Sequence, residues 1–246
     1  MLNPAQIAAM LDHSMLQPYL TDYEIARGCD IALEYHTASV CARPADMPTV
    51  VKRLDGSGID ACTVIGFPHG SVQPDVKLYE ARRALDDGAS ELDMVINIGR
   101  MRAGDEAYVH DEIAAICEAA HLQNAIVKVI LENCYLTFNE IARACDICSH
   151  CGADFVKTST GYGKYGAKLR DLLLMKRSIS PGMRMKAAGG IRTLDMALLC
   201  RFTGCARCGA SATQDIMREA LRREAEGTLR DKTQAEFDAA LAAETY

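Results

Sequence analysis

The sequence predicts a closed barrel of eight parallel strands, each followed by a helix, which is the (β/α)8 class of α/β fold. Short apolar runs alternate with amphipathic helical stretches along the 246 residues, an ordinary length for one such barrel. No stretch has the composition of a linker, so we expect a single domain over residues 1–246, ending in a tail after the last helix. The alternative, an open doubly wound sheet, usually has fewer strands and a glycine-rich turn after the first, which is not found here.

The strand-like runs have the continuous apolar composition of strands that are buried on both faces. In chain order we expect them at Ala9–Leu16, His36–Ala42, Asp60–Phe67, Leu92–Ile98, Ile126–Glu132, Asp154–Thr160, Met185–Gly189 and Arg207–Ser211. Helical spacing between and after them predicts helices that include Asp75–Asp87, Asp105–His121, Thr193–Phe202, Thr213–Glu224 and Lys232–Ala243. Eight strands alternating with helices are what a parallel barrel requires.

Four consecutive strand-like runs carry charged groups inside otherwise apolar stretches. These groups are Asp93, Lys128, Lys157 and Lys186. An unpaired charge in a buried strand is strongly unfavourable, so the four groups are expected to share one site and offset each other's burial. A lysine in that setting is a candidate amine nucleophile, because burial and a neighbouring cation both favour the neutral amine.

Three loops that follow strands are rich in glycine, and in such barrels the chemistry lies where strands end and loops begin. The loops are Gly161-Tyr-Gly163, Gly189-Gly190 and Gly209-Ala-Ser211. Glycine lets backbone N–H groups approach a phosphate, and the last two strands usually supply the phosphate site of this fold. We therefore expect a phosphate site here, with Ser211 as a hydroxyl donor.

Eleven cysteines raise the alternative of a redox or metal-binding protein on a barrel scaffold. The closest spacing is Cys145-x-x-Cys148-x-x-Cys151, which has His150 inside it and is similar to iron–sulfur spacings. These residues fall in a helical pattern at 139–152 that ends on glycine, so they would form a stripe rather than a cage. We interpret them as free thiols that behave as small apolar residues. The same interpretation applies to Cys200, Cys205 and Cys208.

The charge and the hydropathy pattern argue against nucleic-acid and membrane partners. The formal net charge of -6 provides no general basic field, and the longest apolar runs are too short to cross a bilayer. The first residues lack the charged-then-apolar pattern of a secretory signal. We expect a cytosolic protein that acts on small molecules.

Seven sequence segments, spread over nearly the whole chain, match the motifs of a known protein family, and the segment around Lys157 is highly specific. They are LDHSML at 11–16, VIGFPHG at 64–70, ELDMVINIG at 91–99, VKVILE at 127–132, GADFVKTSTG at 152–161, KAAGGIR at 186–192 and CGAS at 208–211. With them the chain resembles the 2-deoxyribose-5-phosphate aldolases, class I (Schiff-base) aldolases with a (β/α)8 barrel. The resemblance implies reversible cleavage of 2-deoxy-D-ribose 5-phosphate to D-glyceraldehyde 3-phosphate and acetaldehyde, in a protein that we expect to be a homodimer.

The resemblance also implies a role for each charged residue. Lys157 would be the Schiff-base lysine, and Lys186 would favour its neutral amine by like-charge repulsion. Asp93 would be the general acid/base, acting through a water. Lys128 would support Asp93 electrostatically, and Asp12 would belong to the same polar network. For each, the alternative is a buried ion pair without a catalytic role. No metal or cofactor is implied, because the iminium polarises the substrate as zinc does in class II aldolases.

Phosphate recognition is implied mostly through backbone amides. The residues are Gly161, Gly189, Gly190, Ile191, Arg192, Gly209 and Ser211.

Three positions bear on how far the resemblance holds. Ala212 stands where the family often has a second serine, and Gln17 stands where it frequently has lysine. Loss of one hydroxyl would weaken phosphate binding by about 1–2 kcal/mol. The alternative is therefore the same Schiff-base aldol chemistry on a different aldehyde pair, including unphosphorylated aldehydes. Tyr246 corresponds to a C-terminal tyrosine that assists proton transfer at the enamine carbon in some relatives.

Overall fold

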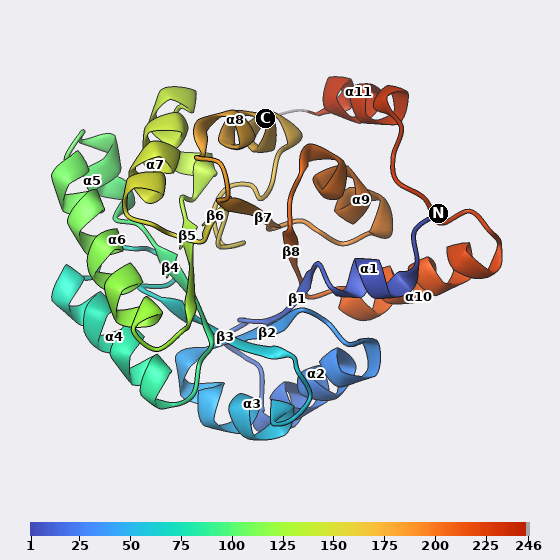
Figure 1. Ribbon diagram of the computed structural model, residues 1–246, viewed down its shortest axis with the longest axis horizontal. Helices are drawn as coiled ribbons and strands as arrows, with labels where there is room; N and C mark the ends of the chain where they lie inside the picture. The colour runs from blue at the N-terminus through green and yellow to red at the C-terminus, as the bar shows by residue number, and fades with distance from the viewer. Residues whose placement is uncertain (245–246) are drawn as a thin grey trace.

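The computed structural model describes residues 1–244 and has the predicted closed parallel barrel (Figure 1). Its strands are β1 (Leu11–Met15), β2 (Ser39–Ala42), β3 (Asp60–Ile65), β4 (Glu91–Val95), β5 (Ile126–Ile130), β6 (Phe155–Lys157), β7 (Arg184–Ala188) and β8 (Arg207–Ala210). Each strand pairs in parallel with the next, and β8 pairs with β1, so the sheet has no open edge. Figure 1 shows the helices as a ring around these strands.

The helices fall close to their predicted positions. They are α1 (Pro4–Ala8), α2 (Asp22–Tyr35), α3 (Met47–Leu54), α4 (Pro74–Asp86), α5 (Ile98–Arg102), α6 (Glu106–His121), α7 (Phe138–His150), α8 (Leu169–Ser178), α9 (Leu194–Thr203), α10 (Thr213–Ala225) and α11 (Gln234–Ala243). Two 3-10 turns, η1 (Pro44–Asp46) and η2 (Asn133–Tyr135), complete the set in the described chain. Thr21, Thr137 and Thr233 begin α2, α7 and α11 as capping boxes, each with a glutamate three residues later.

Several predicted strand ends were wrong, because local turns end the strands sooner. Ala9 is the C-cap of α1, and His36 ends α2 in the left-handed region (φ 53°), so β1 and β2 begin later than predicted. Ile98 opens α5 instead of extending β4. β6 ends at Lys157, sooner than predicted, and in the segment beyond it the Thr160 amide donates to the Glu132 carboxylate (3.2 Å).

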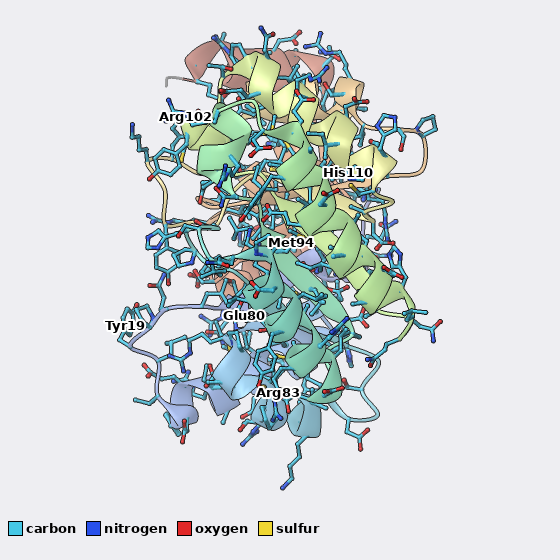
Figure 2. The ribbon with its side chains drawn as sticks, turned by 90° about the vertical axis from the view of Figure 1, so that its left-hand side faces the viewer. Tyr19, Glu80, Arg83, Met94, Arg102 and His110 are labelled. Atoms are coloured by element: carbon cyan, nitrogen blue, oxygen red, sulfur yellow. The ribbon has the colours of Figure 1, made fainter. Side chains whose placement is uncertain are left out.

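Successive strand residues point to opposite sides of the barrel wall. Outward side chains such as Met94 pack against the helices in one large apolar layer; Figure 2 shows Met94 between α4 and α6. The inward side is mostly polar and has a small apolar cluster of Leu16, Cys41, Cys62 and Val64, against which Phe67 packs. Within residues 1–244, no helix combines the length and apolarity that crossing a membrane requires.

A buried ion pair lies outside the barrel, between α4 and α6. Lys77 Nζ donates to Glu112 Oε2 (2.7 Å) and to the Val95 carbonyl at the end of β4 (2.7 Å). Glu112 Oε1 accepts from the Asn97 amide (2.6 Å), and both charged side chains are fully buried. The pair therefore connects two helices to the carboxyl end of β4.

Candidate active site

Asp93, Lys157 and Lys186 meet inside the barrel. Asp93 Oδ2 accepts from Lys157 Nζ (2.6 Å) and from Lys186 Nζ (2.7 Å). The two lysines are register partners on β6 and β7, so their side chains leave the sheet side by side. One carboxylate oxygen therefore lies between two amines and offsets their mutual repulsion.

Lys128 and Asp12 complete the predicted polar network. Lys128 Nζ donates to Asp93 Oδ1 (2.9 Å) from the neighbouring strand β5, and its side chain is fully buried. Asp12 Oδ2 lies 2.5 Å from Lys186 Nζ and 3.5 Å from Lys128 Nζ. The structure thus brings together the five charged residues that the sequence had placed on five different strands.

Two further members of the network, Glu91 and Arg207, were not predicted. Glu91 Oε2 accepts from Lys128 Nζ (2.5 Å), and Arg207 donates to Asp12 (2.6 Å) and to Glu91 (3.1 Å). The period of two along a strand could have identified them, because Glu91 precedes Asp93 by two residues on β4 and Arg207 precedes Gly209 by two on β8.

The network fixes the charge of its central groups. Burial alone would raise the pKa of Asp93, but Lys128, Lys157 and Lys186 together hold that pKa well below its ordinary value. Burial alone would lower the pKa of Lys186, but Asp12 and Asp93 raise it above its ordinary value. At neutral pH Asp93 is therefore a carboxylate and Lys186 an ammonium group.

A pocket of about 160 Å³ opens from this cluster at the carboxyl ends of the strands. Lys157, Lys186, Asp12 and Cys41 line its inner part, whereas Asp93 and Lys128 lie behind the lysines and do not line it. The Lys157 side chain is only 3% exposed, so its amine is accessible almost entirely from the pocket. A molecule in the pocket can reach this amine directly, but it reaches Asp93 only through a lysine or a water.

The glycine-rich loops line the same pocket. All seven residues of the predicted phosphate set are there: Gly161, Gly189, Gly190, Ile191, Arg192, Gly209 and Ser211. A Cβ at Gly189 (φ 80°) would lie 2.8 Å from the Gly166 backbone, so the close approach of these loops requires glycine. The α10 helix begins at Thr213, two residues beyond Ser211, and a helix N-terminus favours an anion.

Tyr162 and Gln17 also line the pocket. Tyr162 Oη donates to the Leu16 carbonyl (2.8 Å) and to Gln17 Oε1 (3.3 Å), and its ring contacts Phe67 edge to face. Gln17, which departs from the family pattern, therefore lines the pocket, whereas Ala212 does not. Tyr162 was not predicted as a site residue, although it stands between Gly161 and Gly163 of the predicted phosphate loop. Tyr246 lies outside the described residues.

Cys145 and Cys148 lie on α7 and Cys151 is its C-cap, in agreement with the helical interpretation. Cys145 and Cys148 are buried and Cys151 is partly exposed, all as free thiols. Burial raises the pKa of Cys145 to about 12, which keeps it an inert thiol. Within the described residues the sole His/Cys/Asp/Glu group of metal-ligand geometry lies elsewhere, at Cys41, Cys62 and Asp93.

The chain belongs to the DeoC/LacD family of aldolases, whose family model matches residues 6–217. It is 44% identical to the deoxyribose-phosphate aldolase of Treponema denticola over 82% of this chain and 94% of the relative. It is 46% identical to that of Thermococcus gammatolerans over 84% of this chain and 92% of the relative.

Solved structures agree with this assignment. The tetrameric deoxyribose phosphate aldolase from Aeropyrum pernix superposes with a TM-score of 0.83 at 30% identity, covering 89% of this chain and 92% of that one. An aldolase called QR15 superposes with a TM-score of 0.85 at 34% identity, covering 92% and 99%. The protein is thus an enzyme of the carbon–carbon lyase class.

Proposed function

We propose that this enzyme reversibly cleaves 2-deoxy-D-ribose 5-phosphate to D-glyceraldehyde 3-phosphate and acetaldehyde through a Schiff base on Lys157. The observation that carries the proposal is the position of the Lys157 amine. It is buried, its side chain lines the pocket, and it lies 2.6 Å from the Asp93 carboxylate. A buried amine with an adjacent proton acceptor is suited to attack on a carbonyl carbon.

The chemistry follows from these contacts. The neutral Lys157 amine adds to the aldehyde carbon of the open-chain sugar, and loss of water leaves an iminium ion. The C2–C3 bond then breaks as the C3 hydroxyl loses its proton, and the bonding electrons pass into the iminium to give an enamine. Protonation and hydrolysis of the enamine release acetaldehyde.

Asp93 is the proposed general acid/base in these proton transfers. Its Oδ2 is within hydrogen-bond distance of both Lys157 and Lys186, so a proton taken from Lys157 can be held there. Because Asp93 lies behind the pocket lining, a water or the Lys186 ammonium group carries protons between it and the substrate. Lys128 and Asp12 keep Asp93 and Lys186 charged and in position, so their proposed roles are supporting.

The substrate phosphate is proposed to bind at the loops that follow β6, β7 and β8. The support is that Gly161, Gly189, Gly190 and Ser211 share one pocket with Lys157. Gln17 and Ala212 motivate the second candidate, the same chemistry on an unphosphorylated aldehyde pair. Rates with deoxyribose 5-phosphate and free deoxyribose separate the two: a preference for the free sugar would favour the second.

Assembly, location and the role of the chain end are further parts of the proposal. We propose a single-domain cytosolic homodimer, in which Tyr246 assists protonation of the enamine. Sedimentation tests the dimer. Removal of Tyr246 is expected to slow hydrogen exchange at the acetaldehyde methyl group without preventing imine formation; unchanged exchange would exclude this role.

Borohydride trapping with acetaldehyde tests the central claim. We expect a reduced ethyl adduct on Lys157, found by peptide mass mapping and lost in Lys157→Ala. Lys164→Ala, which changes an exposed lysine in the loop that follows β6, is the control that should retain the adduct. An adduct on Lys186, or none at all, would overturn the assignment.

A further inference from the structure

Two cysteines lie next to each other on the inner wall of the barrel, beside the lysine cluster. Cys41 of β2 and Cys62 of β3 are register partners, and both belong to the small inner apolar cluster. Their sulfur atoms and an oxygen of Asp93 all lie within 4.8 Å of one another. Neighbouring strands are about 4.8 Å apart, which is within the Cα separations that disulfides span. The two sulfurs can therefore be joined with little movement of the backbone.

The two thiols differ in access. Cys41 lines the pocket, so a molecule of the size of water or hydrogen peroxide can reach its sulfur. Cys62 is fully buried behind it and does not line the pocket. Any reagent from solvent therefore meets Cys41 first, and Cys62 can react only with a group already formed on Cys41.

The pKa values of the two thiols are also shifted in opposite directions by their surroundings. The neighbouring Cys62 thiol and the Lys186 and Lys157 side chains lower the pKa of Cys41, although burial and the Asp93 carboxylate act in the opposite direction. Burial raises the pKa of Cys62, whose S–H donates to Asp93 Oδ1 (3.2 Å). Cys41 is thus suited to attack first as a thiolate, and Cys62 is suited to react second, as the resolving thiol.

We propose that Cys41 and Cys62 are a modification site for small hydroperoxides, which convert them into a disulfide that reversibly inactivates the enzyme. In the first step the Cys41 thiolate attacks one peroxide oxygen, the O–O bond breaks, and the leaving oxygen takes a proton to give water or an alcohol. Cys41 is then a sulfenic acid. In the second step the Cys62 sulfur attacks the Cys41 sulfur, the S–O bond breaks, and the Cys62 proton leaves with the hydroxyl group as water. Two thiols have been oxidised by two electrons and one peroxide reduced.

The disulfide changes the surroundings of Asp93. Closing the S–S bond to about 2.05 Å moves the Cys62 sulfur and removes its S–H, so Asp93 Oδ1 loses a donor. Lys128, whose Nζ lies 3.4 Å from the Cys62 sulfur and 2.9 Å from Asp93, must adjust with it. A bound metal cation fits the group less well, because the Asp93 oxygens already accept hydrogen bonds from the side-chain nitrogens of Lys128, Lys157 and Lys186. The loss of activity rests on the proposed function of Lys157 and Asp93, whereas formation of the disulfide does not.

The test treats the reduced full-length enzyme with a small excess of hydrogen peroxide. Free thiols are then blocked, and peptides are mapped by mass spectrometry without reduction. We expect a peptide containing Cys41 linked to one containing Cys62, and a loss of aldol-cleavage activity of roughly tenfold or more that dithiothreitol restores. In Cys62→Ala, normalised to its own reduced activity, no link can form, so Cys41 is oxidised further and dithiothreitol does not restore activity.

Cys205→Ser is the control, because Cys205 lies in a separate buried group with Cys200 and Cys208. It should retain both the Cys41–Cys62 link and its reversal. Absence of the link in oxidised wild-type enzyme, or a link between other cysteines only, would overturn the proposal; this result depends neither on the folding of a variant nor on the aldolase reaction. A complete link with unchanged activity would refute the inactivation.

Discussion

The buried ion pair between Lys77 and Glu112 gives a sharp prediction about stability. Both side chains are fully buried, and the partners of Lys77 are the Glu112 carboxylate and the Val95 carbonyl, each at 2.7 Å. Burial lowers the pKa of Lys77 and raises that of Glu112, so for each group desolvation outweighs the attraction of its partner. The pair is therefore expected to contribute little net stability, although the loss of one member is costly.

Lys77→Met leaves the Glu112 carboxylate buried with only the Asn97 amide as a donor. Removal of one partner from a buried ion pair costs about 3–5 kcal/mol of the free energy of unfolding, because the other charge is left uncompensated. Replacing both, as Lys77→Met with Glu112→Leu, removes the two desolvation penalties together. The double variant should regain most of what the single variant lost.

The assay is chemical denaturation at neutral pH, with a matched pair on the surface as the control. Arg53 and Asp30 are 2.9 Å apart, but their side chains are 41% and 61% exposed. Arg53→Met should therefore cost no more than about 1 kcal/mol. The reasoning is refuted if Lys77→Met costs no more than Arg53→Met, or if the double variant is less stable than Lys77→Met alone.

Three further predictions concern the barrel and its pocket. A Cβ at Gly209 would lie 3.3 Å from the Lys186 Cε, so Gly209→Ala should displace that ammonium group and lower kcat about tenfold with little change in Tm; an unchanged kcat would contradict this. Burial lowers the pKa of His13 from 6.5 to about 4, so the unfolded chain takes up a proton first and stability falls as the pH drops through this range. The free energy of unfolding is expected to fall by about 3 kcal/mol. Asn at position 13 can still form a hydrogen bond with Thr213 but does not titrate, so His13→Asn should lose less stability between pH 7 and pH 4.5, as measured by urea titrations. Gln17 lines the pocket, so Gln17→Lys, which adds a charged donor there, should lower the KM for the phosphorylated sugar about five- to thirtyfold, with no change for free deoxyribose.

The inner and outer faces of the strands were predictable because a strand alternates its side chains with a fixed period. Asp93, Lys128, Lys157 and Lys186 stood out for this reason: each is a charge within an apolar run, and chain order alone placed them on consecutive strands. The same rule, applied two residues before Asp93, would also have identified Glu91 as an inward-facing charge. Strand ends were less predictable, because local features such as the left-handed cap at His36 and the helix that begins at Ile98 decide them.

The sequence by itself determined the eight-strand barrel, the charged strands and the glycine-rich loops, which depend on local composition and spacing. Its motif segments carried the resemblance to an aldolase family. Only the tertiary structure decided which charges meet. Asp93 Oδ2 accepts from two lysines 64 and 93 residues further along the chain. Arg207 of β8 reaches Asp12 of β1, and these strands become neighbours only when the barrel closes. The pairing of Cys41 with Cys62 likewise depends on the register of β2 and β3. Register and closure arise from packing between distant segments, and local periodicity does not encode them.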